Sequence, residues 1–444
     1  MHATITNEII IRGASLTQAA AIERALTIPN PAFDLALRAG RYTGNLSPRL
    51  EFFRVTRAGD LILPRGFGDE LVRMFPDIAW TDQRLVLPGV NFEFGGQLRG
   101  YQTQAVNAML ARSRGVLQAG TGAGKTVMAM AIIAARKQPC LVLVHNAELL
   151  NQWRDRARQF LGIDAGRIGG GKFEVKPLTI GIINTVRNRL GELAQHFGQI
   201  VVDECHRCPS AMFTEAVNAF PAKYRLGLSA TPYRSDGLTK AIGFFIGPKV
   251  HEVDANHLRE IGAILKPEVI TRQTGFTWCG DQSGEYQRLL SDLTQDETRN
   301  ALIAQDVKRE LAREAGTALV VSDRVGHLEA LAACLRALGE DMVLLTGKTP
   351  TAQREAIVER TRAGKVRVLG STVQLIGEGF DAPGLASLFL ATPIKFSGRL
   401  LQVVGRVLRP QAGKVPRVFD YIDPVGVLTA SAKARAETYR RIAA

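Results

Sequence analysis

The stretch Ala119-Gly-Thr-Gly-Ala-Gly-Lys-Thr126 decides the fold of this 444-residue chain. It follows the short apolar run GVLQ and opens the apolar stretch TVMAMAIIAAR, so a strand, a glycine-rich turn and a helix are expected in succession. Glycines let backbone N–H groups turn toward phosphate oxygens, and the N-terminus of the following helix adds its dipole. In such a loop Lys125 reaches the β- and γ-phosphates and Thr126 binds Mg²⁺. We therefore predict a nucleoside-triphosphate site here.

Two other stretches share part of this pattern. Residues 166–172 have the glycine and lysine spacing, but Phe173 stands where the Mg²⁺-binding hydroxyl is needed. Residues 347–349 have the hydroxyl, but Met342 replaces the upstream glycine. We expect neither stretch to bind a triphosphate.

The alternation of short β-branched runs with helical stretches sets the domain organisation. It extends from about residue 100 to 250 and returns after about 316, which predicts two parallel sheets with crossover helices. The charged stretch 283–316 is expected to form a helical insertion, and the N-terminal part reads as a small α+β domain. The predicted fold class is α/β, with an N-terminal domain at 1–95 and two parallel-sheet domains at 96–250 and 251–444.

A pair of carboxylates gives the second signal. The apolar run Ile200-Val-Val ends in Asp203-Glu204-Cys205-His206, at the edge where ligands bind in parallel sheets. We expect Asp203 to hold Mg²⁺ through water, and Glu204 to orient and deprotonate the attacking water. Cys205 and Cys208 form a CxxC without a second ligand pair, so we expect no zinc site.

A third signal lies near the C-terminus. Gln402, Arg406 and Arg409 are spaced by four and three residues, which places them near one face of a helix. A planar guanidinium suits the charge that develops on a γ-phosphate. Taken alone, the same helix could equally contact a nucleic-acid backbone, and both interpretations stay open.

Composition and charge bound the function classes. With 46% hydrophobic and 22% charged residues the chain is not disordered. It has no run of about 18 apolar residues and no signal-peptide pattern, so no membrane span and a cytoplasmic location are expected. The net charge is +14, and residues 394–444 alone carry 10 basic and 3 acidic residues. Nucleic acid is the leading partner and an acidic membrane surface the second.

Taken in order over residues 98–410, the motifs resemble those of the superfamily 2 helicases and translocases. LRGYQ resembles the adenine-contacting segment of these proteins. AGTGAGKT resembles motif I, DECH resembles motif II, GLSATP resembles motif III, and QVVGRVLR resembles motif VI. LRGYQ, ATPYRSDG and GEGFDAP are most similar to the XPB and phage UvsW group, which is close to restriction-type motor subunits. The chain departs from that group at Arg234-Ser235-Asp236, which lacks the middle acid, and at His145-Asn146 in motif Ia.

The resemblance implies two tandem RecA-like domains with ATP between them, and it assigns residues. The implied catalytic residues are Lys125, Asp203, Glu204, Gln402, Arg406 and Arg409, with Thr126 and Asp203 on Mg²⁺. ATP contacts are implied for Arg99, Gln102, Gly120, Thr121, Gly122, Ala123, Gly124, Lys125, Thr126, Gly379 and Asp381. Coupling is implied for His206, Ser229, Thr231 and Arg234, and nucleic-acid contacts for Asn146, Thr185, Thr346 and Thr372.

The expected function is that of an ATP-dependent DNA helicase or translocase with ATP and Mg²⁺ as cofactors. It would act on duplex, forked or branched DNA, and also on single strands, in recombination, repair or phage-type replication. The N-terminal domain is expected to recognise the DNA substrate. One alternative is an RNA helicase, against which DECH and the N-terminal domain stand. A second is a motor subunit of a restriction or defence complex. Protein partners, polarity and oligomeric state stay open.

Overall fold

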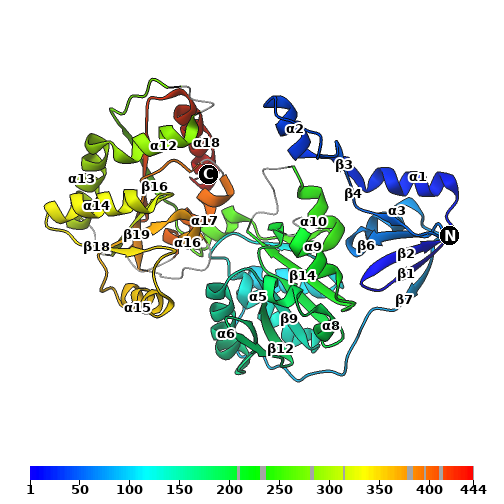
Figure 1. Cartoon of the computed structure of the whole chain (residues 1–444). Coiled ribbons are helices and arrows are strands. Elements are labelled where there is room, and N and C mark those ends of the chain that lie inside the picture. Colours follow the sequence, from blue (N-terminus) through cyan, green and yellow to red (C-terminus); the bar gives the residue numbers. More distant parts are fainter. Residues whose placement is uncertain are drawn as a thin grey trace. The chain divides into compact units, whose positions relative to one another are not determined.

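The structure is a computed structural model of the chain. It describes residues 1–207, 211–230, 237–280, 285–313, 316–377, 384–394, 397–409 and 414–443. The chain passes from one compact unit to a second at Val253–Asp254 (Figure 1). Within the described residues, no helix is both long enough and apolar enough to cross a membrane.

The N-terminal part of the first unit is a five-stranded sheet with helices beside it. The strand order is β5-β6-β2-β1-β7, in which only the β1–β7 pair is parallel. Alternation along β1 and β2 buries Ala3, Ile5, Ile9 and Ile11 in the core. The elements are β1 (His2–Ile5), β2 (Glu8–Arg12), α1 (Leu16–Ala25), β3 (Thr27–Pro29), α2 (Pro31–Arg38), β4 (Arg49–Glu51), β5 (Arg54–Val55), β6 (Leu61–Pro64), α3 (Gly68–Met74) and β7 (Ala79–Asp82).

A buried arginine ties this small sheet to the next one. Arg65 is fully buried, and its guanidinium donates to the carbonyl oxygen of Ala222 at 2.6 Å and to that of Thr6 at 3.3 Å. Burial, followed by the charge of Arg225, holds the pKa of Arg65 well below its usual value. Arg114 adds an ion pair with Asp69 at 2.8 Å. The N-terminal sheet and the first parallel sheet therefore share one continuous core.

The first parallel sheet has the strand order β11-β10-β12-β9-β13-β14-β8-β15, and only the β10–β11 pair is antiparallel. Its strands β9 and β13 are entirely buried, as expected of a sheet covered on both faces. The elements are α4 (Gly100–Leu110), β8 (Arg114–Gln118), α5 (Lys125–Arg136), β9 (Cys140–Val144), α6 (Ala147–Leu161), β10 (Gly166–Gly169), β11 (Lys172–Glu174), β12 (Leu178–Ile182), α7 (Ile183–Arg187), α8 (Leu190–Leu193), β13 (Gln199–Val202), α9 (Ala211–Asn218), β14 (Tyr224–Ser229), α10 (Thr239–Phe245) and β15 (Lys249–Glu252).

The second unit contains a six-stranded parallel sheet in the order β16-β21-β20-β17-β19-β18. Its central strands β17 and β20 are buried along their whole length. The elements are α11 (Ala255–Glu260), β16 (Glu268–Gln273), α12 (Tyr286–Gln295), α13 (Glu297–Arg313), β17 (Thr317–Ser322), α14 (Val325–Ala337), β18 (Met342–Leu345), α15 (Thr351–Arg362), β19 (Val368–Thr372), α16 (Val373–Gly377), β20 (Leu385–Leu390), α17 (Ser397–Val407), β21 (Arg417–Ile422) and α18 (Gly426–Ala443).

The charged stretch 283–316 is helical as expected, but one side of it is buried. The helices α12 and α13 occupy most of the charged stretch 283–316, but α13 places Ile303, Ala304 and Val307 in the core of the second unit. It is amphipathic, so its apolar stripe packs on the sheet, and its buried face also includes the charged Arg299, Asp306 and Glu310. In the N-terminal part, α1 ends at Ala25, and Thr27–Pro29 then pair with β4.

Candidate nucleotide-hydrolysis site

The glycine-rich loop joins β8 to α5, as its flanking residues predict. Gly122 and Gly124 have φ angles of 91° and 82°, a left-handed conformation that glycine adopts without strain. Lys125 is the first residue of α5, and its ammonium donates to the carbonyl oxygen of Ala119 at 3.0 Å. The loop thus holds its own lysine at the N-terminus of a 12-residue helix, a position that favours anions. The stretch at 166–172 instead forms the β10–β11 hairpin.

Gln102 closes on this loop from α4. Its side chain is buried, and its Oε1 accepts a hydrogen bond from the backbone N–H of Arg99 at 2.9 Å. A Cβ at Gly124 would lie 2.5 Å from Gln102 Nε2, and the φ of 82° at this position also favours glycine. Arg99 is exposed at the start of the helix. Contact of these two residues with adenine stays a prediction.

Asp203 and Glu204 lie directly after β13, which runs between β9 and β14. Asp203 is 6% exposed, and both of its carboxylate oxygens accept hydrogen bonds. Oδ1 accepts from the backbone N–H of Glu204 at 3.0 Å, and Oδ2 accepts from Trp153 Nε1 at 2.8 Å. Burial, together with the neighbouring charge of Glu204, raises the pKa of Asp203. A bound cation would relieve both effects.

Glu204 sits in a strained conformation. Its φ is +49°, which a residue with a side chain rarely adopts and which is typical of functional positions. Burial opposes ionisation, but the hydrogen bond from His206 and the charge of Lys125 outweigh it and lower the pKa of Glu204 to about 2. Its carboxylate is therefore ionised at neutral pH, as a base that accepts a proton from water must be.

The tertiary structure joins the DECH segment to the end of β14. His206 Nδ1 lies 3.2 Å from Ser229 Oγ and 3.3 Å from Glu204 Oε2. Of the four coupling residues, His206 and Ser229 are thus brought together, while Thr231 and Arg234 lie outside the described residues. Cys205 is buried beside Gly227, and Cys208 also lies outside them.

The nucleic-acid candidates are divided between the two units. Asn146 is the N-cap of α6, where its side chain accepts from the backbone N–H of Leu149 at 2.8 Å, and Thr185 is half-buried in α7. Thr372 is half-buried at the end of β19. Thr346 departs from the expectation of a surface contact, because its side chain is 6% exposed and its hydroxyl accepts from Lys348 N within a tight turn.

In the second unit, α17 carries Gln402 and Arg406 as half-buried side chains. Arg406 Nε donates to the carbonyl oxygen of Ile376 at 3.2 Å. Arg409 does not lie on the helix as its spacing predicted, because α17 ends at Val407. Gly379 and Asp381 lie outside the part of the chain that the structure describes.

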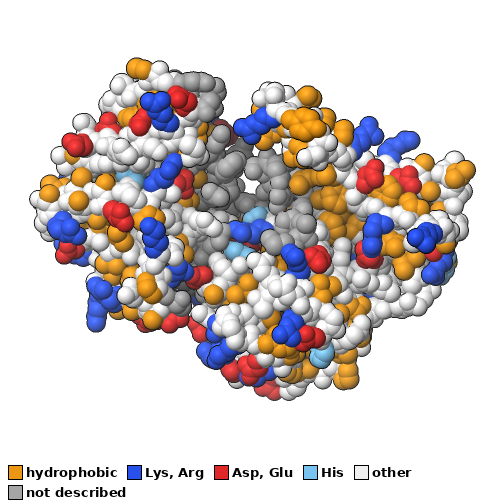
Figure 2. All heavy atoms as spheres, in the orientation of Figure 1, with side chains coloured by type: hydrophobic (Ala, Val, Ile, Leu, Met, Phe, Trp, Pro, Cys, Tyr) orange, Lys and Arg blue, Asp and Glu red, His pale blue; other side chains and the backbone are white. Residues whose placement is uncertain are grey.

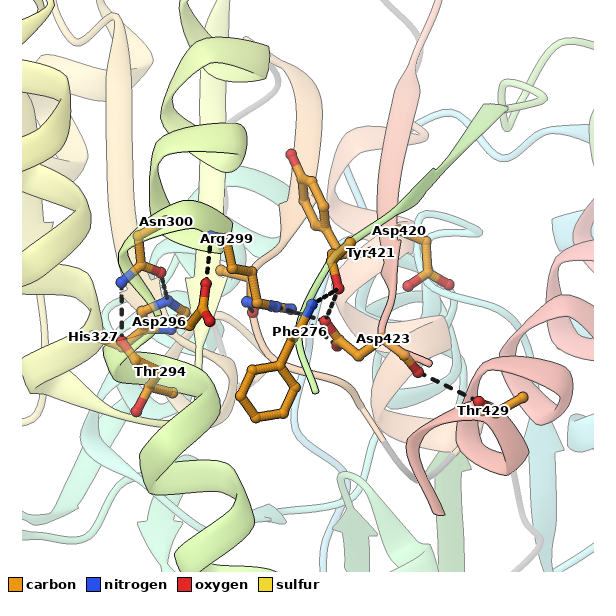
Figure 3. Close-up of polar contacts among 12 residues, drawn as sticks. Phe276, Thr294, Asp296, Arg299, Asn300, His327, Asp420, Tyr421, Asp423 and Thr429 are labelled. Carbon is orange, nitrogen blue, oxygen red and sulfur yellow. Dashed lines mark hydrogen bonds and ion pairs between the residues drawn. The ribbon is translucent and has the colours of Figure 1, made fainter. Parts of the chain in front are cut away.

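A buried polar network that sequence reasoning missed lies in the second unit (Figure 3). Arg299 on α13 pairs with Asp423 at 2.8 Å and donates to the carbonyl oxygen of Ala391 at 2.7 Å. His327 contacts Asn300 at 2.8 Å and Ser322 at 3.0 Å. Burial, followed by the charge of Arg299, lowers the pKa of His327 to about 3. The network thus ties α13 and α14 to the end of β17 and to the segments that follow β20 and β21.

The donors near the loop suit Mg²⁺. They are oxygens of Asp203 and of the Thr126 hydroxyl, and Mg²⁺ is typically held by one or two carboxylates together with substrate phosphates. Within the described residues, no group of three or more His, Cys, Asp and Glu side chains could hold a metal ion by itself. The site therefore fits a metal that arrives with a nucleotide.

Two parallel α/β units, with a phosphate loop and a carboxylate pair in the first and an arginine-bearing helix in the second, define a nucleotide-driven motor of the RecA-like class. Residues 95–234 match the family described as "Type III restriction enzyme, res subunit". Residues 297–411 match the family described as "Helicase conserved C-terminal domain".

Similar proteins agree with this class. DNA 3'-5' translocase XPB2 of Sulfurisphaera tokodaii is 28% identical over 70% of this chain and 79% of its own length. Probable helicase D10 of Escherichia phage T5 is 27% identical over 73% of this chain and 71% of its own length. The structure of S. cerevisiae Dbp5 bound to RNA and ADP BeF3 matches with a TM-score of 0.55 and 16% identity over 78% of this chain and 93% of that one, a likeness of fold alone. The chain thus carries the two domain matches of a helicase and is similar to DNA helicases and translocases named XPB.

Proposed function

We propose that this protein is an ATP-dependent DNA helicase or translocase that acts on duplex or branched DNA. The observation that carries the proposal is the convergence of charge: the ammonium of Lys125 favours the ionised form of both Asp203 and Glu204, although burial and the charge of Glu204 leave the pKa of Asp203 raised overall. A cation from the phosphate loop and two carboxylates from a neighbouring strand end thus converge on one point, where the triphosphate and its metal would bind.

Each residue has a distinct task in hydrolysis. Lys125 exchanges the carbonyl of Ala119 for phosphate oxygens, while the glycine-rich loop offers its backbone N–H groups. Mg²⁺, held by Thr126 and Asp203, would neutralise charge on the phosphates. Glu204 orients a water molecule and accepts its proton as the water oxygen bonds to the γ-phosphorus. The bond from that phosphorus to the β–γ bridging oxygen breaks, and ADP and phosphate leave.

The second unit supplies positive charge. Arg406 and Arg409 would stabilise the transition state of hydrolysis, as arginine residues do in related motors. Gln402 would contact the same phosphate. Ser229 of motif III contacts His206, which in turn contacts Glu204, and this path would couple ATP hydrolysis at Glu204 to DNA binding. Asn146, Thr185, Thr346 and Thr372 are the proposed DNA contacts, with Thr346 acting after its turn opens.

The N-terminal sheet bears a projecting segment suited to nucleic acid. In α2 and the loop after it, every side chain of residues 31–49 is exposed or half-buried. Figure 2 shows hydrophobic and basic side chains side by side there. Tyr42 is 85% exposed, and Arg38, Arg41 and Arg49 are exposed as well. Aromatic rings stack on bases and arginines bind phosphates, so we propose that this segment contacts the DNA substrate.

DNA is preferred over RNA because the similar proteins are named as DNA helicases or translocases. Several of those names specify 3'-5' movement, and we propose that direction here. A role in repair or recombination fits the same group, and we expect the protein to act in the cytoplasm. The match to a restriction-enzyme subunit favours one second candidate, a motor that serves a nuclease supplied by a partner.

ATPase rate and strand separation should be measured on bare duplex, forks, Holliday junctions, single strands and RNA. We expect the largest stimulation by duplex or branched DNA, with Lys125→Ala at least about 10³-fold slower because it removes transition-state stabilisation. Stimulation by RNA alone would exclude the proposal. DNA-stimulated hydrolysis without strand separation on any substrate would favour the translocating restriction-type motor.

A further inference from the structure

The proposed site contains a contact that no sequence motif assigns to it. Trp153 lies on α6 and is 1% exposed, and its indole N–H donates to Asp203 Oδ2 at 2.8 Å. The two residues are 50 positions apart in the chain. The face of α6 that carries Leu150, Ala157 and Leu161 packs against the sheet, and this places the indole over the carboxyl end of β13.

The contact has a chemical consequence for Asp203. Its Oδ1 already accepts from the backbone N–H of Glu204, so the indole N–H fixes the remaining rotation of the carboxylate. A buried carboxylate whose two oxygens each accept an N–H hydrogen bond keeps one orientation. A carboxylate with a single donor can rotate about its Cβ–Cγ bond. Partners of this kind, which orient a metal-binding side chain without touching the metal, typically contribute 10–100-fold to metal affinity.

We propose that Trp153 is a positioning residue for Mg²⁺-dependent hydrolysis, which acts by fixing the orientation of the Asp203 carboxylate. The inference rests on the proposed role of Asp203 at the nucleotide site. The competing interpretation is that the indole N–H merely finds an acceptor so that α6 can pack, as buried tryptophans generally require. The two differ in what the loss of the N–H changes: Mg²⁺ dependence in the first case and thermal stability alone in the second.

The chain contains a matched control. Trp278 Nε1 donates to Asp292 Oδ2, also at 2.8 Å, in the second unit, and neither residue is among those assigned to the nucleotide. Trp153→Phe and Trp278→Phe therefore delete the same kind of hydrogen bond with the same loss of ring volume. Both variants should be compared with wild type for the Mg²⁺ dependence of ATPase, for binding of a fluorescent ATP analogue with Mg²⁺ or with EDTA, and for thermal unfolding.

For Trp153→Phe we expect the Mg²⁺ concentration at half-maximal rate to rise about tenfold, while binding of the analogue in EDTA changes less than twofold. Trp278→Phe should leave both quantities at their wild-type values. An unchanged Mg²⁺ dependence in Trp153→Phe, with only a lower melting temperature, would overturn the inference. The proposed function would survive that result, since it depends on wild-type hydrolysis and on the Lys125→Ala variant.

A second measurement covers the case in which Trp153→Phe does not fold. The chain has three tryptophans, so Trp80→Phe combined with Trp278→Phe leaves Trp153 as the sole indole fluorophore. In this background we expect MgATP to change the Trp153 emission at the Mg²⁺ concentrations that support hydrolysis, and Asp203→Asn to abolish that change. Trp153 emission that does not change with Mg²⁺ concentration, in a protein that hydrolyses ATP, would count against the inference.

Discussion

His206 Nδ1 lies 3.2 Å from Ser229 Oγ, and this contact joins the segment after β13 to the end of β14 beside Glu204. The same ring nitrogen is 3.3 Å from Glu204 Oε2, so one imidazole faces both the proposed base and the segment proposed to sense DNA. A change at Ser229 can therefore reach Glu204 through a single side chain.

For Ser229→Ala we expect strand separation or translocation to fall about tenfold, while ATP binding stays within about twofold of wild type. The variant removes one hydrogen-bonding partner of His206 but leaves Lys125, Asp203 and Glu204 in place. Parallel assays would measure the rate of strand separation or translocation per ATP hydrolysed. Ser387→Ala, at a buried serine of β20, is the control. An unchanged ratio would remove Ser229 from the coupling pathway.

Glu204→Gln should separate binding from hydrolysis. The amide keeps the shape of the side chain but cannot accept a proton from water, so we expect turnover to fall by at least about 10²-fold with ATP affinity retained. Equilibrium binding of labelled ATP and single-turnover hydrolysis would test this. Glu174→Gln, at an exposed carboxylate of β11, should change neither. Loss of affinity together with rate would mean that Glu204 serves the fold of the loop instead.

Arg409→Ala should lower DNA-stimulated turnover by about 10³-fold or more at saturating DNA, if the guanidinium acts on the phosphate. If it instead binds the DNA backbone, affinity for DNA falls and the salt dependence of binding loses about one unit of slope. Titrations of DNA at several salt concentrations, with ATPase as readout, distinguish the two. Recovery of full turnover by added DNA would assign Arg409 to the DNA contact.

Stability should depend on His327 in mildly acidic solution. Its pKa is lowered to about 3 in the folded state, against about 6.5 in an unfolded chain, so between these values only the unfolded state takes up the proton. Its contribution to stability is complete above pH 6.5 and is lost as the pH falls toward 3. By this linkage the free energy of unfolding drops by about 2 kcal/mol between pH 7 and pH 5.

Chemical unfolding of wild type and His327→Gln at pH 7 and pH 5 would check this expectation. The free energy of unfolding of His327→Gln should fall less than that of wild type between pH 7 and pH 5, whatever its value at pH 7. His257→Gln, at a half-exposed histidine of α11, should behave as wild type. Equal losses in wild type and His327→Gln would show that other groups set the acid sensitivity.

The sequence determined the features that depend on neighbouring residues. The glycines lie in one loop between a strand and a helix, and Lys125 and Thr126 begin that helix, so their spacing was enough to predict the loop. The carboxylates of Asp203 and Glu204 follow directly on an apolar strand, and the two parallel sheets follow from the repeated alternation of strand and helix. These are short-range patterns, and backbone geometry fixes their outcome locally.

Only the tertiary structure decided which distant side chains meet. Trp153 on α6 reaches Asp203 across 50 residues, and Arg299 on α13 reaches Asp423 across 124, because helices packed on a sheet lie beside the ends of strands that are distant in the chain. Arg409 lies beyond α17, although its spacing predicted a place on the helix face. Thr346, which the family resemblance gave as a nucleic-acid contact, lies inside a tight turn. A buried polar group must find some partner, but which partner it finds depends on packing between elements that no local pattern encodes.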